Sequence, residues 1–239
     1  MDLADPTRAV TPTLDGPVLS ALAAAGRPMT AGEVALLTVR GSEIGVRRSL
    51  ARLVEQGIVR SSEIGRTRVH ELNRDHIAAP IAVLLADLRN EMWKRLRDTL
   101  GKWKVRPVYA AAFGSAARKS GGSDSDVDLF LIHPAFPGEK ASGRGRNLAG
   151  VLGTLALDLS LPLTSERDAE TWNQQVDRLR QLVLSWTGNH LQVVDVSPYE
   201  WADGRAARAS IFDEIERDAV VLVQAGSLAG AAKSLRTSS

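Results

Sequence analysis

The chain has no cysteine among its 239 residues. Disulfide bonds, thiolate zinc sites and cysteine nucleophiles are therefore excluded, and we expect a reducing, cytoplasmic location. No apolar run reaches the roughly 18 residues that a membrane-spanning helix needs. The first 13 residues are polar and lack the apolar segment of a secretory signal peptide. We therefore expect neither a membrane partner nor a secretory leader.

Two common functional signatures are also missing. The sequence contains no Gly-x-x-x-x-Gly-Lys-Ser/Thr motif, which excludes a P-loop. The four histidines do not have the spacing of metal ligands. Aromatic residues make up only 5% of the chain, so few side chains are available to stack on nucleic-acid bases.

Composition otherwise indicates a folded chain with an uneven charge. Hydrophobic residues make up 44% of the sequence, which is enough for a sizeable core. Residues 1–106 carry 17 Lys and Arg against 12 Asp and Glu, whereas residues 107–239 carry 13 against 16. The basic half favours a polyanionic partner and the acidic half is compatible with metal ligands. Ordinary surface variation is an equal alternative.

Three short helical patterns followed by two strands occupy the N-terminal region. Helices are expected over residues 18–24, 30–37 and 42–56, with capping-box spacing between Thr30 and Glu33 and with Gly57 after the third helix. Strands are expected at 58–60 and 67–70, around a turn that contains Gly65. This order resembles a winged helix-turn-helix domain, here at residues 14–75, preceded by a flexible arm at 1–13.

Arginines are concentrated on the third helical pattern and on the hairpin. In winged-helix domains these elements contact nucleic acid, where arginine side chains bind phosphates or read guanine. The candidate nucleic-acid-binding residues are Arg40, Arg47, Arg48, Arg52, Arg66 and Arg68. The resemblance therefore implies a DNA or RNA partner. A basic face on a protein-binding module is the alternative.

A long amphipathic helix is expected next, within residues 76–104. Its apolar positions recur at helical spacing from Ile77 to Trp103, and charged residues such as Arg89 and Lys94 lie between them. We interpret it as a connecting helix that packs against the following domain. Pairing with a second copy of the chain, to form a homodimer, is the alternative.

Short apolar runs and one further amphipathic pattern follow. Strands are expected at 108–113, 127–132 and 191–196, because each is a short apolar run next to turn residues. Helices are expected at 170–186 and 211–223.

The turn after the strand at 108–113 can bind phosphate. Glycine permits a close backbone approach, and serine supplies a hydroxyl beside exposed N–H groups, as Gly114 and Ser115 do here. Arg118 and Lys119 add positive charge nearby. We therefore expect these four residues to bind the phosphate groups of a substrate.

Asp126 lies twelve residues after Gly114, and Asp128 follows two residues later. Asp126 and Asp128 are two residues apart in a strand pattern, so their side chains project to the same face. Neighbouring carboxylates repel each other unless a cation lies between them, and two acids together with substrate phosphates suit Mg²⁺. A solvated turn rich in Asp and Ser is the plain alternative.

The combined pattern resembles the DNA polymerase β-type nucleotidyltransferase superfamily, and in particular its minimal domains. The Gly-Ser-x-Ala-Arg motif of those domains matches residues 114–118, and their Ser-Asp-x-Asp-Leu motif matches residues 125–129. Lys119 departs from the glycine that is common in the family. The resemblance covers residues 107–223. It implies an α/β domain with a mixed sheet at 105–225, followed by a flexible tail at 226–239.

The family uses a third carboxylate on a later strand, and the resemblance implies that Asp195 has this role, with Asp158 as the competitor. The implied catalytic and metal-binding set is Asp126, Asp128 and Asp195, which would hold two Mg²⁺ ions. One ion would lower the pKa of an attacking hydroxyl, and the other would neutralise the triphosphate of an NTP. The implied nucleotide-binding residues are Gly114, Ser115, Arg118 and Lys119.

Together these features predict an α+β chain with a winged helix-turn-helix domain, a connecting helix and a nucleotidyltransferase domain. The implied activity is Mg²⁺-dependent transfer of an NMP from an NTP to an RNA, a protein or a small molecule, in a toxin–antitoxin or defence context. The alternative is a transcriptional regulator whose nucleotidyltransferase-like domain only binds or senses nucleotide. A third hypothesis, modification of an aminoglycoside, is disfavoured by the N-terminal domain.

Overall fold

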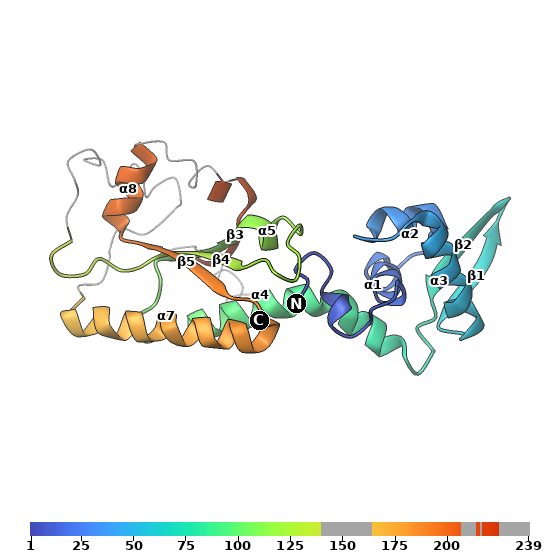
Figure 1. Cartoon of the computed structure of the whole chain (residues 1–239), viewed down its shortest axis with the longest axis horizontal. Coiled ribbons are helices and arrows are strands. Elements are labelled where there is room, and N and C mark those ends of the chain that lie inside the picture. The colour runs from blue at the N-terminus through green and yellow to red at the C-terminus, as the bar shows by residue number, and fades with distance from the viewer. Residues whose placement is uncertain (140–163, 207–213, 216, 225–239) are drawn as a thin grey trace, which may run out of the picture. The chain divides into compact units, whose positions relative to one another are not determined.

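A computed structural model describes residues 1–139, 164–206, 214–215 and 217–224 (Figure 1). The chain divides into two compact units, one of residues 1–93 with 121–124, and one of residues 94–120 with 125 onward. The division falls inside α4, Ala79–Gly101, which is the long helix expected at 76–104. Among the described residues no helix is long and apolar enough to cross a membrane.

The first unit contains three helices followed by a β-hairpin, in the order expected from the sequence. Its elements are α1 (Asp15–Ala25), α2 (Ala31–Leu37), α3 (Glu43–Glu55), β1 (Val59–Ile64) and β2 (Thr67–Leu72). The predicted capping box at the start of α2 is confirmed, because the side chains of Thr30 and Glu33 each accept the other's backbone N–H. Gly57 follows α3 with φ of +76°, a left-handed angle that glycine adopts without strain.

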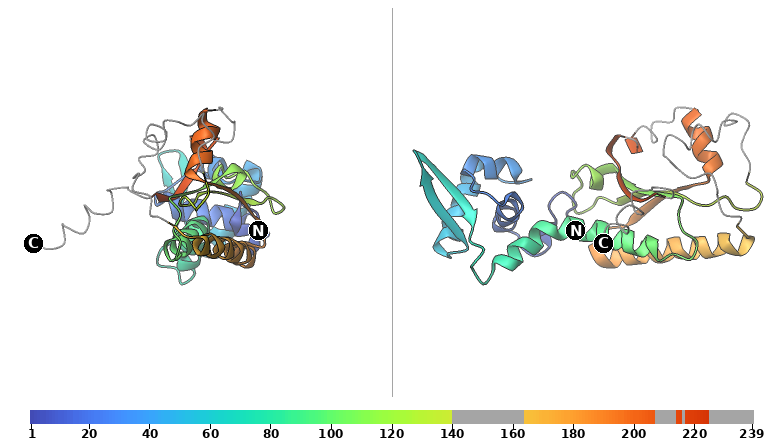
Figure 2. Two further views of the ribbon diagram at one scale, coloured as in Figure 1. Left: turned by 90° about the vertical axis from the view of Figure 1, so that its left-hand side faces the viewer. Right: turned by 180° about the vertical axis from the view of Figure 1, so that it is seen from behind.

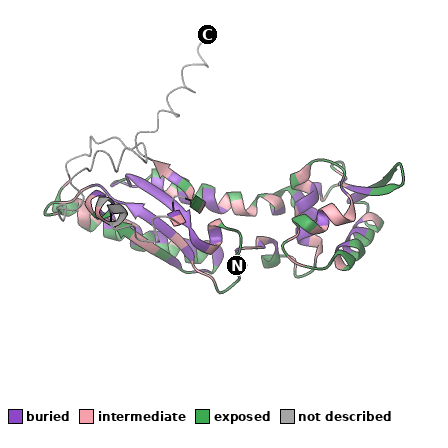
Figure 3. Cartoon of the chain, turned by 90° about the horizontal axis from the view of Figure 1, so that it is seen from above, coloured by how far each residue is buried: buried purple, intermediate pink, exposed green. Residues whose placement is uncertain are grey.

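The core of the first unit lies between these helices and the base of the hairpin. Buried apolar side chains from the three helices meet there; they include Val18, Leu22, Val34, Val46 and Leu50. Figure 3 colours the buried stretches of the chain purple. Met29 and His70 exchange backbone hydrogen bonds of 2.8 and 2.7 Å, which fix the hairpin against the segment before α2. Figure 2 shows the hairpin extending beyond the helices of this unit.

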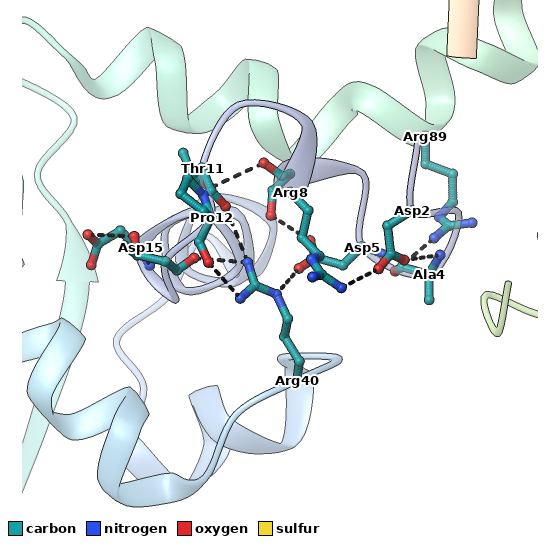
Figure 4. A network of polar contacts seen from close by, with 11 residues as sticks. Asp2, Ala4, Asp5, Arg8, Thr11, Pro12, Asp15, Arg40 and Arg89 are labelled. Atoms are coloured by element: carbon teal, nitrogen blue, oxygen red, sulfur yellow. Dashed lines mark hydrogen bonds and ion pairs between the residues drawn. The ribbon is translucent and has the colours of Figure 1, made fainter. Parts of the chain in front are cut away.

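Residues 1–13 differ from the flexible arm that the sequence led us to expect. They contain a 3₁₀ helix, η1 (Pro6–Ala9), and Leu3 is only 1% exposed. Arg40 donates from Nε to Asp5 at 2.6 Å, and from its terminal nitrogens to the carbonyl oxygens of Thr11, Pro12 and Thr13 (Figure 4). Two arginines hold the segment, because Arg89 also donates to the carbonyl oxygens of Leu3 and Ala4. The polar sequence of residues 1–13 suggested a flexible arm, because the arginines that hold this segment are distant from it in the sequence.

The second unit is built on a four-stranded mixed sheet in the order β5-β4-β3-β6. Its strands are β3 (Tyr109–Phe113), β4 (Val127–Ile132), β5 (Leu191–Val196) and β6 (Val220–Gln224). β3 pairs antiparallel with both β4 and β6, whereas β4 pairs parallel with β5. The predicted mixed sheet is therefore confirmed. The strands β3 and β4 are almost wholly buried (Figure 3).

Helices cover both faces of this sheet (Figures 1 and 2). α7 (Glu166–Thr187) lies along one face, and α8 (Pro198–Ala206) lies on the other. The α8 side chain Trp201 is fully buried, with its ring centroid 5.1 Å from that of Phe130 on β4. Since side chains alternate along a strand, Phe130 and Asp128 point to the α8 face, and Leu129 and Leu131 point to the α7 face.

The helix expected at 211–223 is wrong over its C-terminal part. Residues 220–224 form the edge strand β6, which pairs with β3. A short apolar run that contains three valines fits a buried strand as well as a helix, and the free edge of β3 decides between them. The expected tail at 226–239 lies outside the described residues.

Candidate active site

A turn at Gly114 brings the end of β3 against the start of β4. Phe113 and Asp128 are paired across the two strands, and Gly114 begins the short helix α5 (Gly114–Ala117) with φ of +67°. A Cβ atom added to Gly114 would lie 2.2 Å from Oδ2 of Asp128. Any side chain at this position would displace the carboxylate, and the backbone angle also favours glycine. The turn and Asp128 are therefore in direct contact.

Asp126 and Asp128 form an acidic pair at the start of β4. Asp128 is partly buried and faces the α8 side of the sheet, and Asp126 is two residues earlier in the same alternation. Burial raises the pKa of the Asp128 carboxyl, the charge of Asp126 raises it further, and Arg118 opposes both effects. Both effects disfavour the ionised form of Asp128, and a divalent cation between the two carboxylates would favour it.

Two cations follow the turn, and they differ in their surroundings. Arg118 approaches Glu214 at 3.7 Å and Asp218 at 3.8 Å, so acids from the segment before β6 hold its guanidinium. Lys119 is exposed and has φ of +60°, the one positive value for a non-glycine residue in the described part of the chain. This left-handed angle explains why glycine suits the position, and it costs a lysine about 1 kcal/mol. Ser115 is half-buried in the first turn of α5.

Asp195 does not join the acidic pair, contrary to the expectation from the resemblance. It pairs with Leu131 in the parallel ladder, and residues paired in this way point to the same face, which here is the α7 face. Its Oδ2 accepts a hydrogen bond of 2.7 Å from Nε1 of Trp172 on α7. Partial burial of this carboxyl raises its pKa, although the residue as a whole is exposed. Asp158, the competing candidate, lies outside the described residues.

Gln192 and Glu214 are the neighbours of the acidic pair that sequence reasoning missed. Gln192 pairs with Asp128 across β4 and β5, and its Nε2 donates to Oδ2 of Asp126 at 3.2 Å. Glu214 is close enough to raise the pKa of Asp128. Side chains alternate between the two faces of the strand at 191–196, so Gln192 and Asp195 point to opposite faces. The sequence alone does not tell which of these two faces is the one that carries Asp128.

Two carboxylates at this site are placed to bind a divalent cation, but a third carboxylate is not. Asp126 and Asp128 are hard oxygen ligands of the kind that Mg²⁺ takes together with substrate phosphates. In the described ranges no group of three His, Cys, Asp or Glu side chains is arranged to hold a metal ion. The residues present therefore fit one ion bound by the acidic pair, completed by oxygens from elsewhere.

The first unit has a basic groove between α2, α3 and the hairpin. The groove has a volume of about 1050 Å³, and its lining includes Arg47, Arg66 and Arg68 together with the hydroxyls of Thr30, Ser61, Ser62 and Thr67. Two of these arginines have acidic partners at the surface: Arg47 lies 2.6 Å from Glu43, and Arg68 lies 3.4 Å from Glu63. The groove thus combines three arginines, two glutamates and several hydroxyls.

Of the remaining arginine candidates, one is exposed at the surface and two are bonded to other residues of the first unit. Arg48 is exposed on α3. Arg52 is ion-paired with Asp15 at the start of α1. Arg40 is turned toward residues 5–13, with its guanidinium bonded to one carboxylate and three carbonyl oxygens. Four of its five N–H groups are used on this segment, so we correct its expected role from nucleic-acid binding to holding the N-terminal segment.

The mixed sheet presents an acidic pair against a glycine-serine turn, an arrangement that is compatible with phosphoryl transfer. Comparison with known families agrees, because residues 91–184 match the family model of the nucleotidyltransferase domain. This match supports a nucleotidyl-transfer enzyme. The matched segment includes the turn and both acids and ends before β5. No curated protein and no solved structure matches the chain.

Proposed function

We propose that the enzyme transfers an NMP from an NTP to a hydroxyl group of an acceptor, with Mg²⁺ as the divalent cation. The observation that carries this proposal is the contact between Gly114 and the Asp128 carboxylate, with Asp126 beside it. Phosphate oxygens at the turn and a cation at the acids would then be immediate neighbours. The acceptor would be an RNA, a protein or a small molecule.

In the proposed reaction the acceptor oxygen forms a bond to the α-phosphorus of the NTP. The bond from the α-phosphorus to the oxygen that bridges it to the β-phosphorus breaks, and pyrophosphate leaves with that electron pair. The proton of the acceptor hydroxyl passes to solvent. Such reactions depend mainly on positioning and on charge neutralisation, which this site is built to provide.

Each residue of the site has a separate task in this scheme. Asp126 and Asp128 would hold Mg²⁺, whose chemistry is to neutralise the triphosphate and to lower the pKa of the attacking hydroxyl. Gly114 leaves room for the Asp128 carboxylate against the backbone of the turn, and Ser115 offers a hydroxyl to a phosphate oxygen. Arg118 would exchange Glu214 and Asp218 for the triphosphate, since its two ion pairs are long and partly exposed.

The N-terminal unit would bind nucleic acid through the basic groove, as a winged helix-turn-helix domain. Arg47, Arg66 and Arg68 line the groove, and Arg48 is exposed on the neighbouring helix. Glu43 and Glu63 are exposed, so phosphates can replace them at small cost. This geometry supports phosphate binding more directly than base reading, because several groove residues are hydroxyls with no sequence preference.

The test is label transfer from α-³²P-NTPs in the presence of Mg²⁺ and total RNA, with the purified full chain. The wild type is expected to label RNA, the protein itself or an added small molecule, and Asp128→Ala is expected to label none of them. Separate reactions without RNA identify the acceptor class. If the wild type binds NTP but transfers no label to any acceptor, the alternative of a nucleotide-sensing regulator takes the place of this proposal.

A further inference from the structure

The strand β5 brings one side chain to the acidic pair, and this side chain is an amide. Gln192 is the register partner of Asp128 in the parallel ladder and therefore projects to the same face of the sheet. Its Nε2 donates to Oδ2 of Asp126 at 3.2 Å. Gln192 is also exposed to solvent.

The acid of the same strand is held on the opposite face. Asp195 is three residues further along β5, and an odd separation in a strand reverses the direction of the side chain. The hydrogen bond from Trp172 fixes it against α7. The carboxylate cannot reach the acidic pair without breaking this bond and turning the strand over. A change of rotamer alone is not enough.

We propose, on the basis of the proposed function, that Gln192 is the positioning residue of the metal site and its neutral third oxygen donor. The amide nitrogen is used on Asp126, which orients that carboxylate, and the amide oxygen of Gln192 would be the third ligand. The site formed by Asp126, Asp128 and Gln192 carries two negative charges. A site with three acids would carry three.

The lower charge has a consequence for how a divalent cation is bound. Affinity for a hard cation rises with the number of charged ligands, so an acidic pair with an amide holds the ion weakly. The triphosphate supplies the missing negative oxygens, and the cation is therefore retained mainly when an NTP is present. Gln192 thereby couples cation binding to nucleotide binding.

A titration of the full-length protein with Mn²⁺, in which free Mn²⁺ is followed by electron paramagnetic resonance, tests this inference without any turnover. Gln192→Glu places a third charge at the site and is expected to tighten Mn²⁺ binding about tenfold in the absence of nucleotide. Gln192→Ala removes the hydrogen bond to Asp126 and is expected to weaken binding about threefold. Asp195→Asn is the matched control from the same strand, and its affinity is expected to equal that of the wild type.

The outcomes separate this inference from the function on which it rests. If wild type and Asp128→Asn bind Mn²⁺ equally, whether weakly or not at all, the proposed metal site itself is wrong. If binding depends on Asp128 but Gln192→Glu binds no more tightly than the wild type, the role of Gln192 is wrong and the metal site stands. Loss of Mn²⁺ binding in Asp195→Asn also overturns the inference, because Asp195 rather than Gln192 would then be the third ligand.

Discussion

Two pairs of aspartates, one in each compact unit, have opposite surroundings. In the first unit Asp5 is paired with Arg40, and Asp15 with Arg52, so each acid is neutralised where it lies. In the second unit Asp126 and Asp128 stand together, and the pKa of Asp128 is raised by burial and by its neighbour. The first arrangement stabilises a fold. The second destabilises the metal-free fold, and a bound cation would offset this loss. Groups with perturbed pKa values are typical of functional sites.

The largest effect is expected from Gly114→Ala. The new methyl group meets the Asp128 carboxylate at 2.2 Å, and alanine is strained at φ of +67°. We expect a loss of about 3 kcal/mol in the free energy of unfolding, together with loss of label transfer. Urea denaturation measures the first and the transfer assay the second.

Gly65→Ala is the matched control, since Gly65 has φ of +63° but no atom within 4 Å of the added methyl group. It is expected to cost about 1 kcal/mol, from the backbone angle alone. Equal losses at the two positions would show that the contact with Asp128 is not tight.

Arg40→Ala is expected to have the next largest effect. It leaves the buried Asp5 carboxylate without its ion-pair partner and frees three carbonyl oxygens, so we expect a loss of about 2 kcal/mol in unfolding free energy. Residues 1–13 should then exchange their amide hydrogens faster, which mass spectrometry detects. Arg66→Ala, in the groove, should leave stability unchanged and weaken RNA or DNA binding. The reverse pattern would restore Arg40 to the nucleic-acid surface.

Smaller effects of opposite sign are expected at two aspartates. Asp128→Asn relieves the repulsion of the acidic pair and should stabilise the metal-free protein by about 1 kcal/mol at pH 7. The pKa of Asp15 is lowered, because hydrogen bonds from Ser49 and Arg52 outweigh the effect of burial, so Asp15→Asn should destabilise by a similar amount.

Both differences should shrink on acidification, which urea denaturation between pH 7 and pH 3 measures. The cost at Asp128 is fully present above its raised folded pKa, and it fades as the pH falls toward the unfolded value of about 3.9. The benefit at Asp15 is present above that unfolded value and is lost as the pH falls through its lower folded pKa. Destabilisation by Asp128→Asn at pH 7 would contradict the contrast between the units.

The smallest effect is expected from Glu214→Gln. It removes one of the two acids that hold Arg118 and so makes the guanidinium more available to a triphosphate. We expect the KM for NTP to fall about threefold with little change in kcat, as steady-state kinetics would show. An increased KM would instead indicate that Glu214 helps to hold the cation.

The elements of the fold and the acidic pair were predictable from the sequence for local reasons. Asp126 and Asp128 lie on either side of a buried valine, a pattern that can be recognised without knowing the partner strand. The capping box before α2 also depends only on residues that are close together in the sequence. The direction of Asp195 was not predictable, because it depends on the register of β5 against β4. The same limit applies to β6 and to Arg40, whose structures depend on a free strand edge and on a carboxylate 35 residues away.

The most direct test of the account compares label transfer by Asp128→Asn and Asp195→Asn under saturating Mg²⁺ and NTP. Asp128 touches the turn that would hold phosphate, whereas Asp195 is bonded to Trp172 on the far side of the sheet. The account predicts a fall of about a thousandfold or more for the first variant and a near wild-type rate for the second. Comparable losses in both, or full activity in Asp128→Asn, would contradict it.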